Sequence, residues 1–205
     1  MARKTGFEKA VVAMLDDNEQ ILTGDAGLSE NGLYTIDARS SLGVISANIT
    51  GLAPAVTKIY GSDQNVDVVQ QGSGNVQCTL AANDIPSEIL YRLAGMKQDA
   101  TSGAYYQDTS TKPVKAALLL MSHNRQGLPI YFALYKGSFG PEEVQLNTNT
   151  EQPQLKTDSI VFAALNRFSD KRIFGTYTVD PSGKTKDEGT VFADVFSGYK
   201  ASSGQ

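Results

Sequence analysis

The chain contains one histidine and one cysteine, His123 and Cys78, so any triad or thiol chemistry would have to use them. His123 lies beside Asn124 and Arg125 in a polar segment between two apolar runs. This setting is typical of a solvated turn residue, and a catalytic base is the alternative. Cys78 shares the apolar face of an alternating segment, where cysteine acts as a small core hydrophobe. A single cysteine forms no internal disulfide and indicates a reducing compartment.

Three short patterns look like functional motifs but lack the context that those motifs need. "SGKT" at 182–185 matches the end of a phosphate-binding loop, but the chain has Thr178 where that loop needs glycine, and no helix pattern follows. "NIT" at 48–50 matches a glycosylation acceptor without a secretion signal before it. The adjacent acids at 16–17 and 142–143 point apart on a strand or turn. With one His and one Cys there is also no zinc-ligand spacing. The sequence therefore predicts no enzyme activity, no cofactor and no metal site.

The composition excludes several classes of protein. The 205 residues are 40% hydrophobic, which is enough for one substantial core. A net charge of -4 and a pI near 5.0 argue against a nucleic-acid binder with a basic face. The longest apolar run, 116–121, is far shorter than the ~18 residues that span a membrane. The N-terminal apolar patch is short and acids follow it at once, so we expect synthesis and retention in a cytoplasm.

Most of the chain shows the patterns of β-strands. Val76, Cys78 and Leu80 alternate with polar residues, which is the period of a half-buried strand. Two predicted hairpins follow, 114–121 with 128–136 and 159–167 with 172–179. A Gly-rich segment, 16–55, precedes them and contains two weak strands. The remaining predicted strands are 9–15, 33–36, 44–49, 56–60, 65–69 and a closing strand at 191–196.

One stretch, "NDIPSEILYRLAGMK" at 83–97, predicts a helix. Asn83 or Asp84 can cap its first turn, where Pro86 loses nothing by lacking an N–H. Gly95 can take the left-handed conformation that ends a helix. A helix of about ten residues is marginal alone, so it needs a sheet to pack on. Its apolar stripe, at helical spacing, consists of Ile89, Leu90 and Leu93.

These elements predict a mainly β fold, an antiparallel two-sheet sandwich or barrel with one flanking helix at about 85–94. We expect a single domain over 1–196. Within it, the segment 16–55 is long for a connection in a compact domain, which favours a functional or mobile role. Residues 197–205 are expected to form a flexible tail.

The order of elements is similar to that of the major tail proteins of long-tailed, non-contractile bacteriophages of Gram-positive bacteria. The similarity spans roughly 30–180 and is clearest in the segment 55–99. There a turn follows a strand, then a Gly-rich turn and an alternating strand lead into an "Asp-Ile-Pro-x-Glu" helix that ends "Leu-x-Gly". Two further similar stretches are "LPIYFALYKGSFGPEE" and "TDSIVFAALNR". The residues that match the central pattern are Tyr60, Gly61, Ser62, Asp63, Gly72, Gly74, Asp84, Ile85, Pro86, Glu88, Leu93 and Gly95.

The resemblance implies a structural function. It implies rings of this chain, usually hexameric, that stack into the tail tube through which the genome leaves the virion. Its implied partners are further copies of the chain, a tape-measure protein, a tail-tip or baseplate initiator and a tail terminator. DNA would pass without sequence-specific binding, and no membrane contact is implied. The implied location is the virion tail, after assembly in the host cytoplasm.

Two groups of residues are candidates for roles in such a tube. The segment 16–55 is a candidate contact between stacked rings, because long loops commonly become ordered on assembly; a merely mobile loop is the alternative. Asp63 and Asp67 are candidates for acids that face the lumen, where negative charge would keep DNA from sticking. Ordinary solvated surface is the alternative for both.

Three other functions stay open at the level of sequence. The same fold could serve as the inner tube of a contractile injection system. A β-sandwich module that binds a receptor or ligand is a second reading. An enzyme with an unfamiliar site built on Tyr, Asp and Lys is a third, although no pattern in the sequence supports it.

Overall fold

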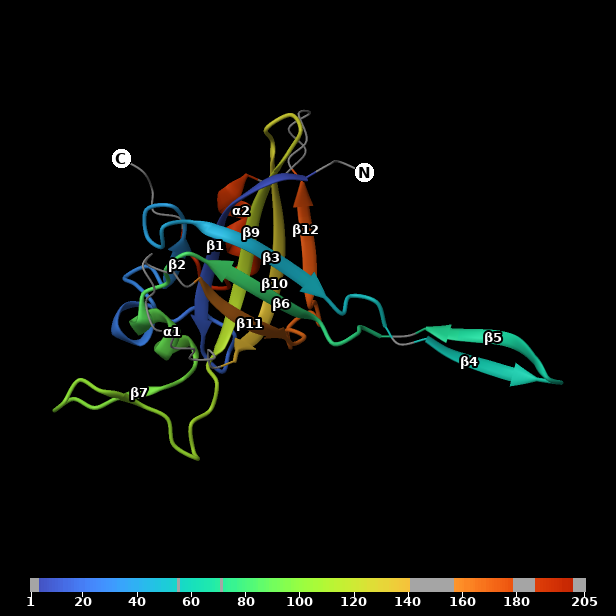
Figure 1. Ribbon diagram of the computed structural model, residues 1–205, viewed down its shortest axis with the longest axis horizontal. Helices are drawn as coiled ribbons and strands as arrows, with labels where there is room; N and C mark the ends of the chain where they lie inside the picture. Colours follow the sequence, from blue (N-terminus) through green and yellow to red (C-terminus); the bar gives the residue numbers. More distant parts are fainter. Residues whose placement is uncertain (1–3, 55, 71, 141–156, 179–186, 201–205) are drawn as a thin grey trace, which may run out of the picture.

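The structure is a computed structural model that describes residues 4–54, 56–70, 72–140, 157–178 and 187–200. In these ranges the chain is mostly antiparallel β, with two α-helices, and Figure 1 shows one body with a long hairpin projecting from it. The helices are α1 (Ser87–Leu93) and α2 (Glu188–Val195). The strands are β1 (Lys4–Leu15), β2 (Leu33–Ile36), β3 (Val44–Thr50), β4 (Val56–Gly61), β5 (Gln64–Gln70), β6 (Gln77–Ala82), β7 (Lys97–Gln98), β8 (Tyr105–Tyr106), β9 (Lys115–Asn124), β10 (Pro129–Phe139), β11 (Asp158–Ala164) and β12 (Phe174–Thr178).

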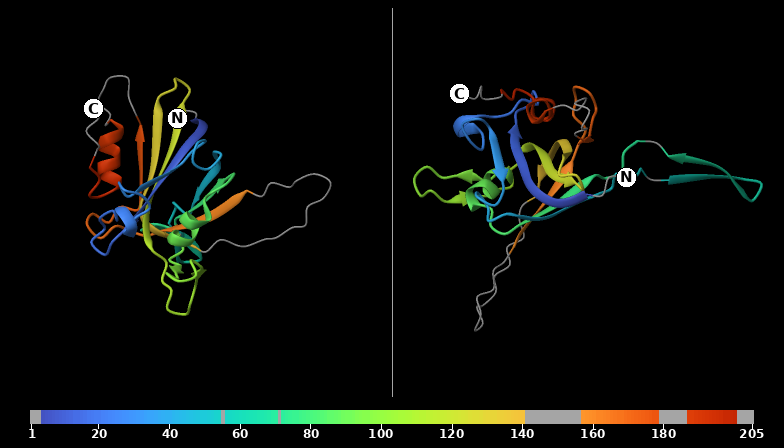
Figure 2. Two further views of the ribbon diagram at one scale, coloured as in Figure 1. Left: turned by 90° about the vertical axis from the view of Figure 1, so that its left-hand side faces the viewer. Right: turned by 90° about the horizontal axis from the view of Figure 1, so that it is seen from above.

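The body is one continuous, strongly bent sheet that forms two layers. Its strand order is β2-β1-β9-β10-β11-β6-β3, and β12 also pairs with β10. Strands β2, β1, β9, β10 and β12 form one layer, while β11, β6 and β3 cross in front of it (Figures 1 and 2). All the pairs are antiparallel and the sheet does not close into a barrel. The predicted fold class, an antiparallel sandwich with a flanking helix, is confirmed.

The long strand β10 turns the sheet from one layer into the other. Its pairing with β9 shifts register between Leu134 and Gly137. Before the shift β10 pairs with β12, and after it with β11. A Cβ at Gly137 would overlap the backbone oxygen of Ala163, so glycine permits the close crossing. The predicted second hairpin was therefore wrong. Both of its strands form, but β12 pairs with the first half of β10 and β11 with the second half. The bend in β10 allows this, because it turns the two halves of the strand into different layers.

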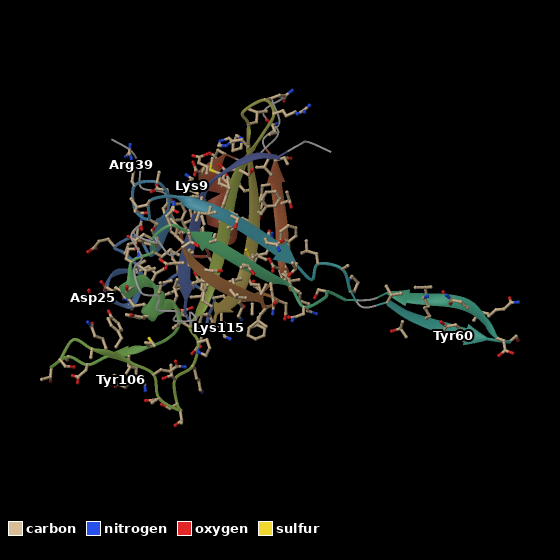
Figure 3. All side chains as sticks on the ribbon, in the orientation of Figure 1. Lys9, Asp25, Arg39, Tyr60, Tyr106 and Lys115 are labelled. Carbon is tan, nitrogen blue, oxygen red and sulfur yellow. The ribbon has the colours of Figure 1, made fainter. Side chains whose placement is uncertain are left out.

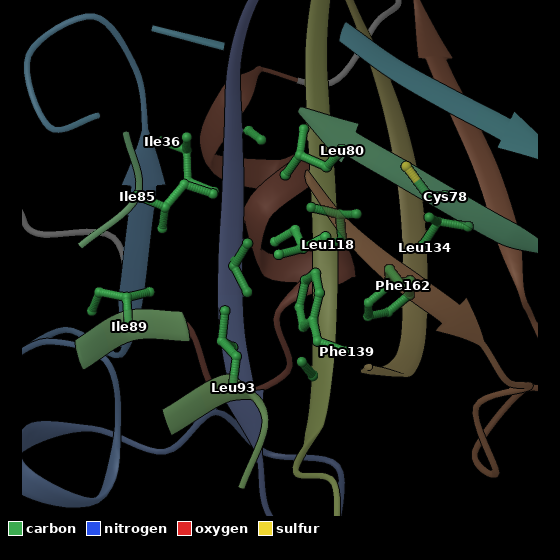
Figure 4. Close-up of a cluster of buried hydrophobic side chains, with 14 of the residues drawn as sticks. Ile36, Cys78, Leu80, Ile85, Ile89, Leu93, Leu118, Leu134, Phe139 and Phe162 are labelled. Atoms are coloured by element: carbon green, nitrogen blue, oxygen red, sulfur yellow. The ribbon is translucent and has the colours of Figure 1, made fainter. Parts of the chain in front are cut away.

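Two hydrophobic cores lie on opposite faces of the first layer. The main core fills the space between the layers, with Leu80, Leu118, Leu134 and Phe162 fully buried (Figure 4). The second core lies between the first layer and α2. It includes residues of β1, β9 and β10 that alternate with those of the main core: Val11, Ala13, Ala117, Leu119, Tyr131 and Tyr135. Because β1 and β9 are covered on both faces, they show continuous apolar runs.

The helix α2 was not foreseen, and the closing strand predicted at 191–196 was wrong. Val191 and Val195, one helical turn apart, pack into the second core. The Asp187 carboxylate accepts a hydrogen bond of 2.9 Å from the Thr190 N–H and caps the helix. Five of the six residues 191–196 are apolar, which suits a strand as well as a short helix, and only the cap distinguishes the two.

The Gly-rich segment 16–55 is part of the body. It contains β2 and β3 and a 3-10 turn, η1 (Gly24–Ala26). Leu28 and Ile36 join the main core. Of the predicted tail 197–205, residues 197–200 are described: the Ser197 oxygen accepts from the Ile21 N–H at 2.9 Å, and Tyr199 packs on the second core. The "SGKT" segment and the acids at 142–143 lie outside the described residues.

Candidate assembly surfaces

The helix α1 covers one end of the space between the two layers. Ile89, Leu90 and Leu93 belong to the main core and are 8%, 8% and 1% exposed, so the predicted stripe is the buried face. Figure 4 shows Ile89 and Leu93 among the core side chains. Gly95 follows with φ 77°. Its N–H donates to the Arg92 oxygen at 3.0 Å, and the Met96 N–H donates to the Tyr91 oxygen at 2.9 Å. These two bonds form a Schellman motif, which requires the left-handed residue that glycine supplies.

The start of α1 differs from the expectation. The residue before the helix is Pro86, and no side chain caps the helix by a hydrogen bond. Asp84 is therefore not the cap: its backbone N–H donates to the Ser41 oxygen at 3.2 Å. The next N–H, of Ile85, donates to Asp158 Oδ2 at 2.8 Å. A residue before proline is driven out of the helical region, so Asp84 and Ile85 tie the extended approach to the body instead.

The hairpin β4–β5 projects far from the body (Figures 1 and 2). It forms a two-stranded sheet of its own, joined by Ser62 and Asp63 between the paired residues Gly61 and Gln64. Ser62 and Asp63 have φ values of 51° and 61°, as in the type I′ turn that fits the twist of a hairpin. Two strands without a further layer are marginally stable in water.

The projecting hairpin exposes apolar side chains along its length. Tyr60 lies near its tip and is 68% exposed (Figure 3). Asp63, in the turn, and Asp67, in β5, are also exposed. The register places Ile59 opposite Asp67 and Val68 opposite Lys58, so both faces of the hairpin carry exposed apolar residues. Exposed apolar surface of this kind indicates contact with another molecule. The other exposed apolar residues of the hairpin are Val56, Ile59, Val66 and Val68.

The outward side of the second layer has no charge. Three cross-strand rows make this surface, which we call the neutral face: Ser46–Ala81–Ser159, Asn48–Thr79–Val161 and Thr50–Gln77–Ala163. The side chains are exposed or half-buried, while the residues between them along each strand, such as Ala47, Leu80 and Ile160, belong to the main core or pack against it. Charged residues make up 20% of the chain, so their absence from nine positions facing outward distinguishes this face from ordinary surface.

The turn 165–172 between β11 and β12, called the Phe168 turn, holds an aromatic ring in solvent. Phe168 is 76% exposed. Its N–H donates to Glu19 Oε1 at 2.7 Å, and the Ser169 N–H donates to Oε2 at 3.3 Å. The Lys136 ammonium lies 3.6 Å from the centroid of the Phe168 ring and 2.7 Å from Glu19 Oε1. Glu19 and Lys136 are themselves buried, so an ion pair supports both the backbone and the ring of Phe168.

Two arginines fasten the same turn to α2. Arg172 makes a bidentate pair with Asp194, at 2.9 and 3.0 Å. Arg167, 5% exposed, donates to the Asp194 backbone oxygen at 2.8 Å and pairs with Asp170. The hydrogen bond from Arg167 holds the pKa of Asp170 well below its ordinary value, although burial opposes this. The turn is therefore rigid on one side through Glu19 and on the other through α2.

His123, Cys78 and Asp16, which the sequence analysis considered for chemistry, make contacts that belong to the fold. His123 Nε2 lies 2.9 Å from Glu8 Oε2 on the paired strands β9 and β1. Cys78 is fully buried, and burial raises the pKa of its thiol to about 12. Asp16 accepts from the N–H groups of Asn18 and Gln20 at 2.9 and 2.8 Å, which shapes its own turn. Among the described residues, no group of three His, Cys, Asp or Glu side chains could hold a metal ion.

Sequence reasoning missed the ion pair that supports the Phe168 turn, and it missed the neutral face. The partners of the buried ion pair are 117 positions apart, and no local pattern joins them. The neutral face could have been found by noting that the polar positions of three alternating strands carry no charge. No helix in the described part of the chain has the length and apolar character needed to cross a membrane.

Comparison with models of protein families gives a match. No curated protein sequence matches the chain. The family model described as phage tail tube protein matches residues 1–204. That family consists of structural components of the virion tail and not of enzymes. With a match over nearly its whole length, the chain belongs to the phage tail tube protein family.

Proposed function

We propose that this chain assembles into stacked, hexameric rings that form the tail tube of a long-tailed, non-contractile phage of a Gram-positive host. The observation that supports ring formation best is the projecting hairpin β4–β5, with its exposed apolar side chains. An isolated two-stranded sheet has little stability of its own. A neighbouring subunit that covers it would bury the apolar side chains and pair its free backbone edges.

The geometry of the hairpin favours contact between neighbours in a ring. It reaches sideways from the body, across the direction in which β1, β9 and β10 run (Figure 1). One subunit thereby presents a protruding arm to a different surface of the next subunit. Such a head-to-tail contact closes into a ring when the rotation between subunits allows it.

The neutral face is our candidate for the wall of the lumen. Duplex DNA carries one negative charge per about 1.7 Å of its axis, so a basic wall would retain it. Ser, Thr, Asn and Gln side chains keep the wall wetted without binding phosphate strongly. The face is also poor material for a subunit contact, because interface cores favour aromatic residues, Met and Arg and contain little Ser or Ala.

We propose separately that the two acids of the hairpin face the lumen. Asp63 and Asp67 are exposed, and a position facing the lumen would place their negative charge against DNA. The hairpin projects far from the neutral face (Figure 3). An experiment can therefore test separately whether the hairpin acids and the neutral face lie at the lumen.

The remaining parts of the proposal concern partners and place. Assembly takes place in the host cytoplasm, begins at a tail-tip or baseplate initiator around a tape-measure protein, and ends at a tail terminator. The segment 16–55 contributes the contact between stacked rings. Support comes from the resemblance and from the family, whose members build the tail.

Negative-stain microscopy and mass measurement in solution test the central proposal. Concentrated pure protein, or protein seeded with tail-tip components, is expected to form rings and cylinders. Replacing Ile59 and Val68 with Asp should leave a folded monomer that forms no rings, because charge would have to be buried at the contact. The matched control is Tyr106→Asp, an exposed aromatic on the separate strand β8. Wild-type protein that never forms closed circles would disprove the proposal.

A further inference from the structure

The geometry points to a specific contact between successive rings: Phe168 of one subunit inserts into an apolar cavity at the edge of the sandwich of another copy. This inference rests on the proposed function, because it names the residues that stack the proposed rings. The cavity, called the edge cavity, measures about 410 Å³ and opens between the two layers.

Phe168 has the properties of an anchor residue. Its ring is 76% exposed, yet its backbone and ring are held by the Glu19–Lys136 pair, and its turn is held by Arg167 and Arg172. A rigid aromatic loses little conformational entropy on binding, and such residues dominate the energetics of interfaces. The buried charges that support it are costly to desolvate, which is difficult to explain for a turn that only connects two strands.

The edge cavity has the properties of an acceptor. Its lining is mostly apolar and aromatic, with Phe7, Phe132 and Phe174 among the side chains. Phe132 and Phe174 stack with their ring centroids 6.4 Å apart. Polar groups of Asn48 and Ser122 are also present. Its volume lies within the range of about 300–1,000 Å³ found for binding pockets, so an aromatic side chain can enter it.

A subunit cannot fill its own edge cavity with its own Phe168. The cavity is lined from Gly6 and Phe7 of β1 to Phe174, which comes soon after the Phe168 turn in the chain. Glu19 and Lys136, however, hold the backbone and the ring of Phe168 in contacts of their own. The cavity also belongs to the main core, between the layers, and the Phe168 turn is fastened to α2 on the other face of the first layer.

Two different sites on a subunit that bind each other in separate copies produce a contact that repeats from copy to copy. Such a head-to-tail contact extends into a filament when it does not close. The hairpin β4–β5 reaches sideways and is assigned to the contact within a ring, so we assign the contact between Phe168 and the edge cavity to successive rings. Both halves of this contact include the segment 16–55: Glu19 holds the turn, and Ala47, Ile49 and Leu52 line the cavity. This agrees with the role proposed for that segment.

A fluorescent probe at Phe168 tests the contact directly. The chain contains no tryptophan, so Phe168→Trp introduces a single reporter. Its emission in the monomer should be that of a solvated indole. On tube formation the emission should shift to shorter wavelength, and quenching by acrylamide should fall several-fold. Tyr106→Trp, at another exposed aromatic, gives the baseline, and an equal shift in both variants or none in Phe168→Trp overturns the inference.

Two further variants approach the contact from its two sides. Phe168→Ala should fold and form rings that do not stack. Ala47→Phe places a ring into the subunit's own cavity, so its melting temperature should be equal to or above that of wild type while stacking is lost. Cylinders of wild-type length from either variant would refute the inference and leave the ring proposal intact. Absence of rings in wild-type protein would instead refute the proposed function.

Discussion

The Lys136 ammonium nitrogen lies 2.7 Å from Oε1 of Glu19, and both side chains are buried. The pair joins β10 to the loop that follows β1 and positions Phe168 at the surface. Glu19 also accepts two backbone N–H groups, so both of its carboxylate oxygens are hydrogen-bonded. Pairing together with hydrogen bonding is the condition under which buried charges are tolerated.

Glu19→Gln should lower the free energy of unfolding by about 3 kcal/mol, because it leaves the Lys136 charge buried without a counter-charge. Urea unfolding of the monomer measures this. The double variant with Lys136→Met removes both charges and should be more stable than Glu19→Gln alone. A double variant that is less stable than the single one would contradict this account.

The Glu19–Lys136 pair also predicts that the stability of the protein depends on pH. Burial would raise the pKa of Glu19, but hydrogen bonds from Lys136 and from the N–H groups of Phe168 and Ser169 outweigh it and lower the pKa. A carboxyl whose pKa is lowered by folding stabilises the protein above its unfolded pKa, near 4.5 here, and this contribution is lost as the pH falls through the folded pKa. Below pH 4.5, wild type should therefore lose stability more steeply than Glu19→Gln. Parallel curves of stability against pH would contradict the assignment.

The helix α1 should be essential to the fold. Leu93 is 1% exposed, and Leu93→Ala should cost about 2–5 kcal/mol in unfolding free energy. Leu90→Asp, which buries a charge in the main core, should leave insoluble protein or none. The control is Glu88→Ala on the exposed side of the helix, expected within about 0.5 kcal/mol of wild type. Soluble Leu90→Asp protein that still forms tubes would refute this role.

Two glycines with positive φ, one of them at the end of α1, allow the cost of backbone strain to be separated from the cost of steric overlap. Gly95 and Gly103 have φ values of 77° and 71°. A Cβ at Gly103 meets nothing, whereas a Cβ at Gly95 would overlap the Lys112 backbone oxygen. Gly103→Ala should therefore cost only the strain of the left-handed region, about 1–2 kcal/mol. Gly95→Ala should cost clearly more, as judged by thermal unfolding of the two variants. Equal losses would show that no overlap occurs.

Sequence patterns predicted the elements that local periodicity determines. The strands β2, β4, β5, β9 and β10 and the helix α1 all formed near their predicted positions. The hairpin predicted between β11 and β12 did not form, because both strands pair with β10, whose bend at Gly137 the sequence pattern does not reveal. The helix α2 was missed because Val191 and Val195 suit a strand equally well. The Phe168 turn depends on Glu19 and Lys136, which only the folded chain brings together.

Hydrogen exchange should locate the stacking contact within the segment 16–55. Exchange in the connections on either side of β2 should slow when rings become tubes, because the next ring excludes water from them. Amides of the paired strands β9 and β10 provide the internal control, since their protection comes from the body itself. Equal protection of 16–55 in rings and in tubes would remove this segment from the contact.

Cysteine accessibility should identify the wall of the lumen. The native thiol of Cys78 is fully buried with a pKa of about 12, so it reacts slowly and single introduced cysteines can be followed. Thr79→Cys places one on the neutral face, and Asp67→Cys places one on the hairpin. In tubes, a residue on the lumen wall should react with a small haloacetamide but not with a bulky polymer-linked maleimide.

The two reagents distinguish every placement of these cysteines. A residue on the outside of the tube reacts with both, and a residue packed between subunits reacts with neither. We expect Thr79→Cys to show the lumen pattern, because the neutral face has neither the charge of ordinary surface nor the aromatic, Met and Arg residues that interface cores favour. Reaction of Thr79→Cys with the bulky reagent in intact tubes would place the neutral face outside. The same result for Asp67→Cys would remove the hairpin acids from the lumen.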